Sequence, residues 1–144
     1  MLIFLASISA YPAANKCTSG DCINGKGTLV MADGRKYEGD WKNGKPHGQG
    51  VMTFKDGAVY TGQFNNGKME GQATMKYPDG KVYTGQFRNE KPNGQGTMVL
   101  PNGIKFEGEY RDGNPDGMGK MTYPDGKVQI GMWKNGKFVG GQKK

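Results

Sequence analysis

A 23-residue repeat constrains this chain more than any other feature of its sequence. The stretch YEGDWKNGKPHGQG begins at Tyr37, and related stretches YTGQFNNGKMEGQA, YTGQFRNEKPNGQG and FEGEYRDGNPDGMG begin at Tyr60, Tyr83 and Phe106. A degraded copy, QIGMWKNGKFVGGQ, begins at Gln129, and the period extends over residues 17–142 without an insertion. Because a catalytic loop occurs once per site, a glycine-rich stretch that keeps recurring indicates a structural repeat.

Each repeat has the pattern of a β-hairpin. Tyr37, Gly39 and Trp41 alternate with two acidic residues, which is the period of a strand with one polar face. The dipeptide Asn43-Gly44 is a strong signal for a two-residue hairpin turn, and apolar alternation resumes after it. We therefore expect two strands per repeat, and nothing after residue 14 indicates a helix.

The repeat columns predict where the core lies. Met residues form one stripe beside the aromatic columns, and an unbroken glycine column separates the two aromatic ones, so the rings can lie over bare backbone. We expect this wall to be core rather than a ligand site, and to become the concave face of the twisted sheet. The predicted core aromatics are Tyr37, Trp41, Tyr60, Phe64, Tyr83, Phe87, Phe106, Tyr110 and Trp133.

These patterns predict an all-β fold, an elongated, twisted, single-layer antiparallel sheet of tandem hairpins. The chain has 26 glycines and a hydrophobic fraction of 34%, which is too little apolar material for an ordinary two-layer core. Regularly spaced aromatics argue against disorder. The predicted divisions are a signal peptide at 1–14, a partial repeat at 15–36, repeats at 37–59, 60–82, 83–105 and 106–128, and a degenerate capping repeat at 129–144.

The first residues, MLIFLASISAYPAANKC, contain a short apolar stretch followed by small residues. The stretch is too short to span a bilayer and resembles a secretory signal peptide, with a buried first strand as the alternative. Export would allow Cys17 and Cys22 to form a disulfide that pins the first repeat. A zinc site would need four ligands, and a redox pair usually has the spacing C-x-x-C, so a structural disulfide is favoured.

The chain has a net charge of +7, and many of its cations lie next to the predicted hairpin turns. Successive turns on one sheet edge should lie about 10 Å apart, so that their potentials partly overlap into a cationic ridge. Such a ridge suits anionic phospholipid headgroups or other polyanions, whereas the plainer interpretation is solubilising charge that blunts the edges. The candidate anion-binding residues are Lys42, Lys45, Lys68, Arg88, Lys91, Arg111, Lys134 and Lys137.

No catalytic constellation is recognisable in the sequence. The chain has one histidine, His47, which excludes an ordinary Ser-His-acid triad. The stretch GNPDGMGK at 113–120 lacks the spacing of a phosphate-binding loop. We expect no enzyme activity, no cofactor and no metal site.

The tandem stretches beginning at Tyr37, Tyr60, Tyr83 and Phe106 resemble MORN repeats, whose pattern is Tyr-x-Gly-x-aromatic-x-x-Gly-x-x-x-Gly-x-Gly. The resemblance implies an open sheet of hairpins and a scaffold that links partners or self-associates. Glu90 and Gln129 depart from the pattern, and Ile130 and Met132 are apolar where earlier repeats are polar, which indicates a cap or a contact surface.

Together these features predict a small exported bacterial protein of the periplasm or cell envelope that binds a protein partner. An anionic membrane surface is the alternative partner, and a homodimer through the sheet ends is a further option. Export would exclude nucleic acid.

Overall fold

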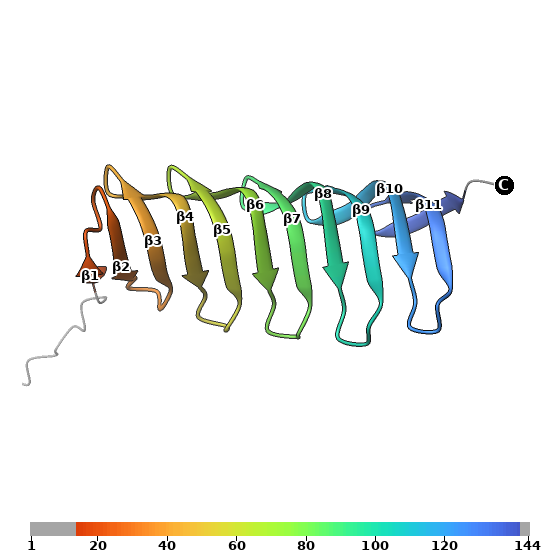
Figure 1. Cartoon of the computed structure of the whole chain (residues 1–144), viewed down its shortest axis with the longest axis horizontal. Helices are drawn as coiled ribbons and strands as arrows, with labels where there is room; N and C mark the ends of the chain where they lie inside the picture. Colours follow the sequence, from red (N-terminus) through yellow and green to blue (C-terminus); the bar gives the residue numbers. More distant parts are fainter. Residues whose placement is uncertain (1–13, 142–144) are drawn as a thin grey trace, which may run out of the picture.

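The structure is a computed structural model that describes residues 14–141. It contains one sheet whose twelve strands follow the chain from end to end (Figure 1). The strands are β1 (Lys16–Gly20), β2 (Lys26–Val30), β3 (Lys36–Lys42), β4 (Lys45–Thr53), β5 (Val59–Asn65), β6 (Lys68–Lys76), β7 (Val82–Arg88), β8 (Lys91–Val99), β9 (Lys105–Arg111), β10 (Asn114–Thr122), β11 (Val128–Lys134) and β12 (Lys137–Gly141).

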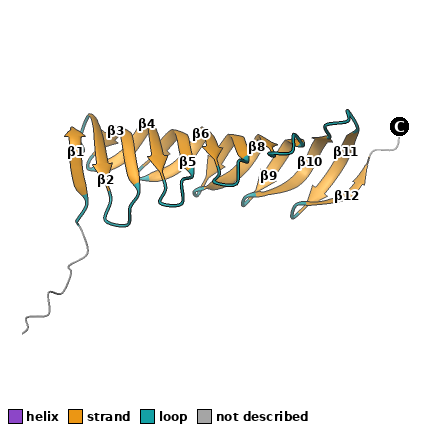
Figure 2. Cartoon of the chain, turned by 90° about the horizontal axis from the view of Figure 1, so that it is seen from below, coloured by secondary structure: helices purple, strands orange, loops and turns teal. Residues whose placement is uncertain are grey.

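Every strand pairs only with its neighbours in sequence, and every pairing is antiparallel. The result is an elongated single layer with β1 and β12 at opposite ends (Figure 2). The part of the chain that the structure describes has strands and turns and no helix. The all-β, single-layer architecture predicted from the repeat is confirmed.

From β2 onward, two kinds of turn alternate along the sheet. The five-residue connections that follow β2, β4, β6, β8 and β10 lie along the lower edge in Figure 1, and the two-residue turns lie along the opposite edge. In the first of these short turns Asn43 and Gly44 have φ angles of 51° and 72°, as the mirror-image turn of a two-residue hairpin requires. Glu90 takes the glycine position of the third turn at a φ of 64°, which glycine adopts far more easily.

One row of small residues crosses the whole sheet. Each member faces the next across a strand pair, from Gly20 in β1 to Gly141 in β12, and Ala73 is the one residue in the row that is not glycine. A Cβ added at Gly50 would collide with the ring of Tyr37. The row therefore provides the bare backbone on which the core rings rest.

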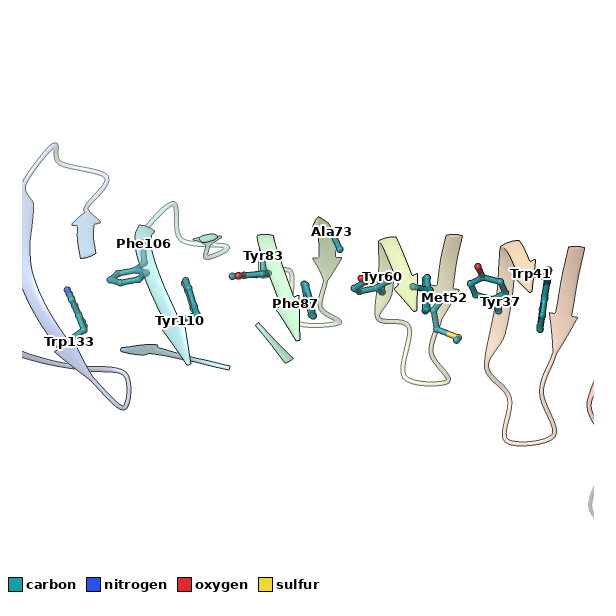
Figure 3. Packing of buried hydrophobic residues seen from close by; sticks show 11 residues of the cluster. Tyr37, Trp41, Met52, Tyr60, Ala73, Tyr83, Phe87, Phe106, Tyr110 and Trp133 are labelled. Carbon is teal, nitrogen blue, oxygen red and sulfur yellow. The ribbon is translucent and has the colours of Figure 1, made fainter. Parts of the chain in front are cut away.

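The core is a continuous zigzag of aromatic rings. Figure 3 shows that the buried side chains stand in a line along the sheet. Neighbouring rings meet edge to face, with centroids 4.9–5.5 Å apart, and the series ends at Phe138. Each such contact contributes about 0.5–1.5 kcal/mol beyond the area it buries. All nine aromatic residues predicted from the columns lie in this core and are at most 6% exposed.

Three tyrosines each fold over the glycine of their own strand and donate a hydrogen bond to a backbone carbonyl. Tyr37 Oη donates to the Asp40 carbonyl at 2.8 Å, and Tyr60 and Tyr83 make the same bond three residues ahead. Burial raises the pKa of Tyr37 to about 12, with the Asp40 charge adding to the effect. Burial likewise raises the pKa of Tyr83 to about 12.

A disulfide joins Cys17 of β1 to Cys22 in the turn that follows, as the spacing predicted. The structure therefore gives the first hairpin a covalent link that the other hairpins lack. The signal peptide predicted over 1–14 lies outside the described residues except for Ala14.

Candidate binding surfaces

The two-residue turns carry the predicted cations. All eight side chains are exposed. Among the described residues, Arg111 alone of the eight makes an ion pair, with Asp116 at 3.9 Å. By contrast, lysines of the opposite edge such as Lys81 and Lys127 lie 3.1 and 3.4 Å from aspartates of their own loops. Seven of the eight predicted cations thus make no ion pair within the described chain, and the acidic residues Glu90 and Asp112 lie in the same turns.

Three of these turns place two cations directly across from each other. The cross-strand partners are Lys42 and Lys45 in the first turn, Arg88 and Lys91 in the third, and Lys134 and Lys137 in the last. Like charges at directly opposed positions destabilise a hairpin. A bound anion would relieve that repulsion, so this arrangement favours an anionic ligand.

Hydrogen bonds between repeats hold the turn edge together. The second residue of each turn donates its backbone N–H to a carbonyl 21 positions earlier; Gly67, for example, donates to Pro46 at 2.8 Å, and Glu90 to Met69 at 3.3 Å. The first residue of a turn can also donate its backbone N–H to a side chain of the preceding repeat, as Asn66 N–H does to His47 Nδ1 at 3.4 Å. The turns are therefore fixed relative to one another.

The other exposed surface is the polar face, opposite the aromatic core. Two shallow hollows of about 650 and 480 Å³ lie there, over the glycine row. The larger is walled by Thr84, Gln86, Gln95 and Thr97. These hollows are local features between side chains, whereas the expected concave curvature toward the aromatic side concerns the whole sheet and stays a prediction. They form there because glycine leaves the floor bare while long polar side chains stand on both sides.

A repeated irregularity in the pairing fixes the polar walls. Between Gly39 and Trp41 of β3, the single residue Asp40 faces the three residues 47–49 of β4, and the same bulge recurs in the next three hairpins. Asp40 Oδ2 accepts the Gln49 backbone N–H at 3.0 Å. The Lys26 ammonium beside Asp40, together with that N–H, lowers the pKa of the carboxyl.

In the next two repeats a glutamine takes the place of Asp40 and accepts the equivalent backbone N–H. Gln63 Oε1 accepts the Gln72 N–H at 2.7 Å, and Gln86 Oε1 accepts the Gln95 N–H at 2.9 Å. The Nε2 groups of Gln63 and Gln86 have no partner within the described chain, so each remains a donor on a side chain already held in place. Reasoning from the sequence missed these clamps, although the recurring polar residue one position after the column glycine was their signal.

No group of His, Cys, Asp and Glu side chains within residues 14–141 is suited to hold a metal ion. Within the same range, the structure has no helix with the length and apolarity needed to cross a membrane.

Comparison with known families agrees with this geometry. The family model described as MORN repeat matches residues 37–59, 60–82, 83–105, 106–128 and 130–140. The chain belongs to the MORN-repeat family. Its hairpins are MORN repeats in tandem, and their aromatic and glycine columns are the core described above.

None of the curated proteins matches this MORN chain. Among solved structures, it is similar to the SAS-4 (dCPAP) TCP domain in complex with a proline-rich motif of Ana2 (dSTIL) of Drosophila melanogaster. The identity is 10%, the TM-score is 0.41, and the match covers 75% of this chain and 72% of that one. A TM-score of this size does not establish a common fold.

Proposed function

We propose that this MORN sheet is a non-enzymatic scaffold that binds a protein partner on its polar face, in the periplasm or cell envelope. The observation that supports the proposal most is the clamped polar face. Gln63 and Gln86 are locked by backbone N–H groups and each keeps a free amide donor, and Gln86 stands in the wall of the larger hollow, which is floored by glycine. Because these donors are already ordered, a partner segment loses less conformational entropy in pairing with them.

Two further features support the proposed compartment and the proposed kind of partner. The Cys17–Cys22 disulfide suits an oxidising compartment such as the periplasm. The repeat also places equivalent groups at intervals of two strands, roughly 10 Å, so an extended partner meets the same contacts several times.

Site-specific photo-crosslinking tests this function. A photoreactive residue at position 84 or 97, both in the wall of the larger hollow, is expected to capture one envelope protein. The same group at Asp79, in an exposed loop at the lower edge, serves as the control and is expected to capture none. The purified partner should then bind the intact sheet and lose affinity when Gln86 is replaced by Ala. Equal capture from all three positions, or none from 84 and 97, would refute the proposal.

The like-charge pairs favour a second candidate function, which is binding to anionic phospholipid or another polyanion through the turn edge. Co-sedimentation with anionic and neutral vesicles at low and physiological salt tests it. We expect anionic vesicles alone to be bound, and binding to be lost when the five lysines of the three pairs, Lys42, Lys45, Lys91, Lys134 and Lys137, become Gln. Binding that disappears in wild type at physiological salt would leave these cations as solubilising charge.

A further inference from the structure

One loop of the lower edge differs in composition from the others. Four of the five connections carry an aspartate at their third residue, and two of those four read YPDGK. The loop 100–104 reads LPNGI and has no charged side chain. Leu100 N–H donates to the Ile104 carbonyl at 2.8 Å, and Ile104 N–H donates to Asn102 Oδ1 at 3.1 Å, the same pair of bonds that the loop 54–58 makes. The loop therefore keeps the backbone of its equivalents, while its side chains are neutral and aliphatic.

The aliphatic side chains of this loop leave the position of a ring unfilled. Three of the other loops begin with an aromatic residue, which is Phe54, Tyr77 or Tyr123. Leu100 begins the loop 100–104. In the preceding loop Lys81 reaches over the Tyr77 ring, with Nζ 5.3 Å from the ring centroid, and Ile104 takes the position of that lysine. Because leucine and isoleucine are shorter than tyrosine and lysine, they do not occupy the same space.

A cavity of about 150 Å³ lies beside this loop on the aromatic face, and it is partly open to solvent. The rings in its wall belong to two residues of β9, Phe106 and Tyr110 (Figure 3). The other side chains in the wall include Met98, Leu100, Ile104 and Met121. None of the described residues that line the cavity carries a charge. Water in a cavity needs about two to four polar partners, whereas a dry apolar cavity of about this volume can bind benzene.

We propose that this cavity binds a small, neutral, aromatic molecule with one ring, which takes the place that Phe54 fills in its own repeat. The volume of the cavity limits the ligand to one ring. A carboxylate or an ammonium group would lose hydration there without meeting an opposite charge in the wall, so the ligand is neutral. Met98 and Met121 favour an aromatic ligand, because thioether sulfur makes favourable contacts with the edges of rings.

The site is independent of the two surfaces considered above. It lies opposite the polar face, so its ligand and the proposed protein partner can be bound together. Because the cavity holds one ring and is partly open, we expect weak binding, with a Kd for toluene of about 1 mM. Added salt should not weaken the binding of an uncharged molecule, whereas it should weaken the binding of anionic vesicles to the turn edge.

NMR of the methionine methyl groups, with toluene as the probe, tests the proposal. A bound ring beside Met98 and Met121 shifts their methyl signals. Met52 occupies the corresponding position two repeats before Met98, in β4, and serves as the internal control. We expect saturable shifts for Met98 and Met121 and none for Met52. Benzoate, which adds a charge to a ring of similar size, should bind at least about tenfold more weakly than toluene.

Two variants restore residues that other repeats hold, so both should fold normally. Leu100→Phe supplies the ring that Phe54 has, and Ile104→Lys supplies the lysine of the preceding loop. We expect Leu100→Phe to abolish the toluene shifts and Ile104→Lys to weaken toluene binding. Val99→Phe adds the same ring on the opposite face, where Val99 is 40% exposed, and should leave toluene binding unchanged.

Four results would overturn the proposal. They are the absence of saturable shifts up to saturating toluene, shifts that persist in both cavity variants, an equal loss of binding in Val99→Phe, and benzoate binding as strong as that of toluene. If Leu100→Phe fails to fold, as circular dichroism would show, Ile104→Lys decides the outcome by the same comparison.

Discussion

Replacing Gly39 by alanine tests whether the glycine row is required by contact with the neighbouring strand. A Cβ at this position would lie 2.5 Å from the Gln49 carbonyl oxygen, 2.5 Å from Gly50 Cα and 2.7 Å from Tyr37 Oη. Two of these three atoms belong to the backbone of β4 and cannot rotate away. The two strands must therefore separate, or the Tyr37 ring must leave its place.

The expected loss of stability follows from three contributions. Overpacking costs about 1–3 kcal/mol, and a backbone contact belongs at the upper end of that range. Weakening the bond from Tyr37 Oη to the Asp40 carbonyl adds about 1 kcal/mol. Alanine also restricts the unfolded chain, which returns about 0.4–1 kcal/mol to the folded state. We expect Gly39→Ala to lower the free energy of unfolding by about 3 kcal/mol and the Tm by roughly 10 °C.

Urea and thermal unfolding followed by circular dichroism measure this loss. Gly140→Ala is the matched control, because nothing lies within 4 Å of a Cβ built there and its φ angle is not positive. Its effect should be within about 0.5 kcal/mol of zero. If Gly39→Ala proves no more destabilising than Gly140→Ala, then close strand contact is not the reason for glycine in this row.

Three more predictions concern the turns, the disulfide and the tyrosines. Glu90→Gly should raise the free energy of unfolding by about 0.5–1 kcal/mol in urea melts, because its φ of 64° suits glycine; a destabilised variant would contradict this. Replacing Cys17 and Cys22 by Ser should lower the free energy of unfolding by about 2 kcal/mol, as expected for a short disulfide loop. Reductant should lower the melting temperature of the wild type by the same amount as the double substitution. A variant with the melting temperature of the oxidised wild type would show that the disulfide is dispensable. The pKa of Tyr37 and of Tyr83 is raised from 10.0 to about 12, so their contribution is complete below pH 10 and is lost as pH rises toward 12. Urea unfolding between pH 9 and 12 should show this fall, and Tyr83→Phe should make it shallower; parallel pH profiles would refute the assignment.

Much of the fold could be predicted because the sequence signals for the strands, the turns and the core all lie within a single repeat. Alternation with a period of two predicts the strands, and Asn-Gly predicts the tight turns. The aromatic residues that recur at the same position of each repeat predict the core. Tyr37 and Trp41 were predictable as core because they recur on both sides of the same glycine column. A repeat that pairs only with its neighbours leaves no choice of topology.

The bulges could not be predicted because they depend on which residues face each other. A glycine inside a strand pattern such as Gly48, which adopts a φ of 92°, is a general sign of a bulge, but it does not show that three residues of β4 face one residue of β3. The clamp formed by Gln63 on the Gln72 N–H exists only once that bulge is in place. The hollows on the polar face depend on these clamps, which is why sequence patterns did not locate them.

The backward direction of the turn hydrogen bonds bears on the order in which the chain folds. Gly44 donates to Ile23, and Gly136 donates to Pro115, so every two-residue turn relies on an acceptor from the repeat before it. As the chain is made from its N-terminus, each new hairpin finds its acceptors already in position. Shortening the chain from the C-terminus should leave the remaining turns satisfied, whereas shortening it from the N-terminus deprives the new first turn of its acceptor. The hairpin of β1 and β2 is the first in the described chain, and it is the one that the disulfide closes.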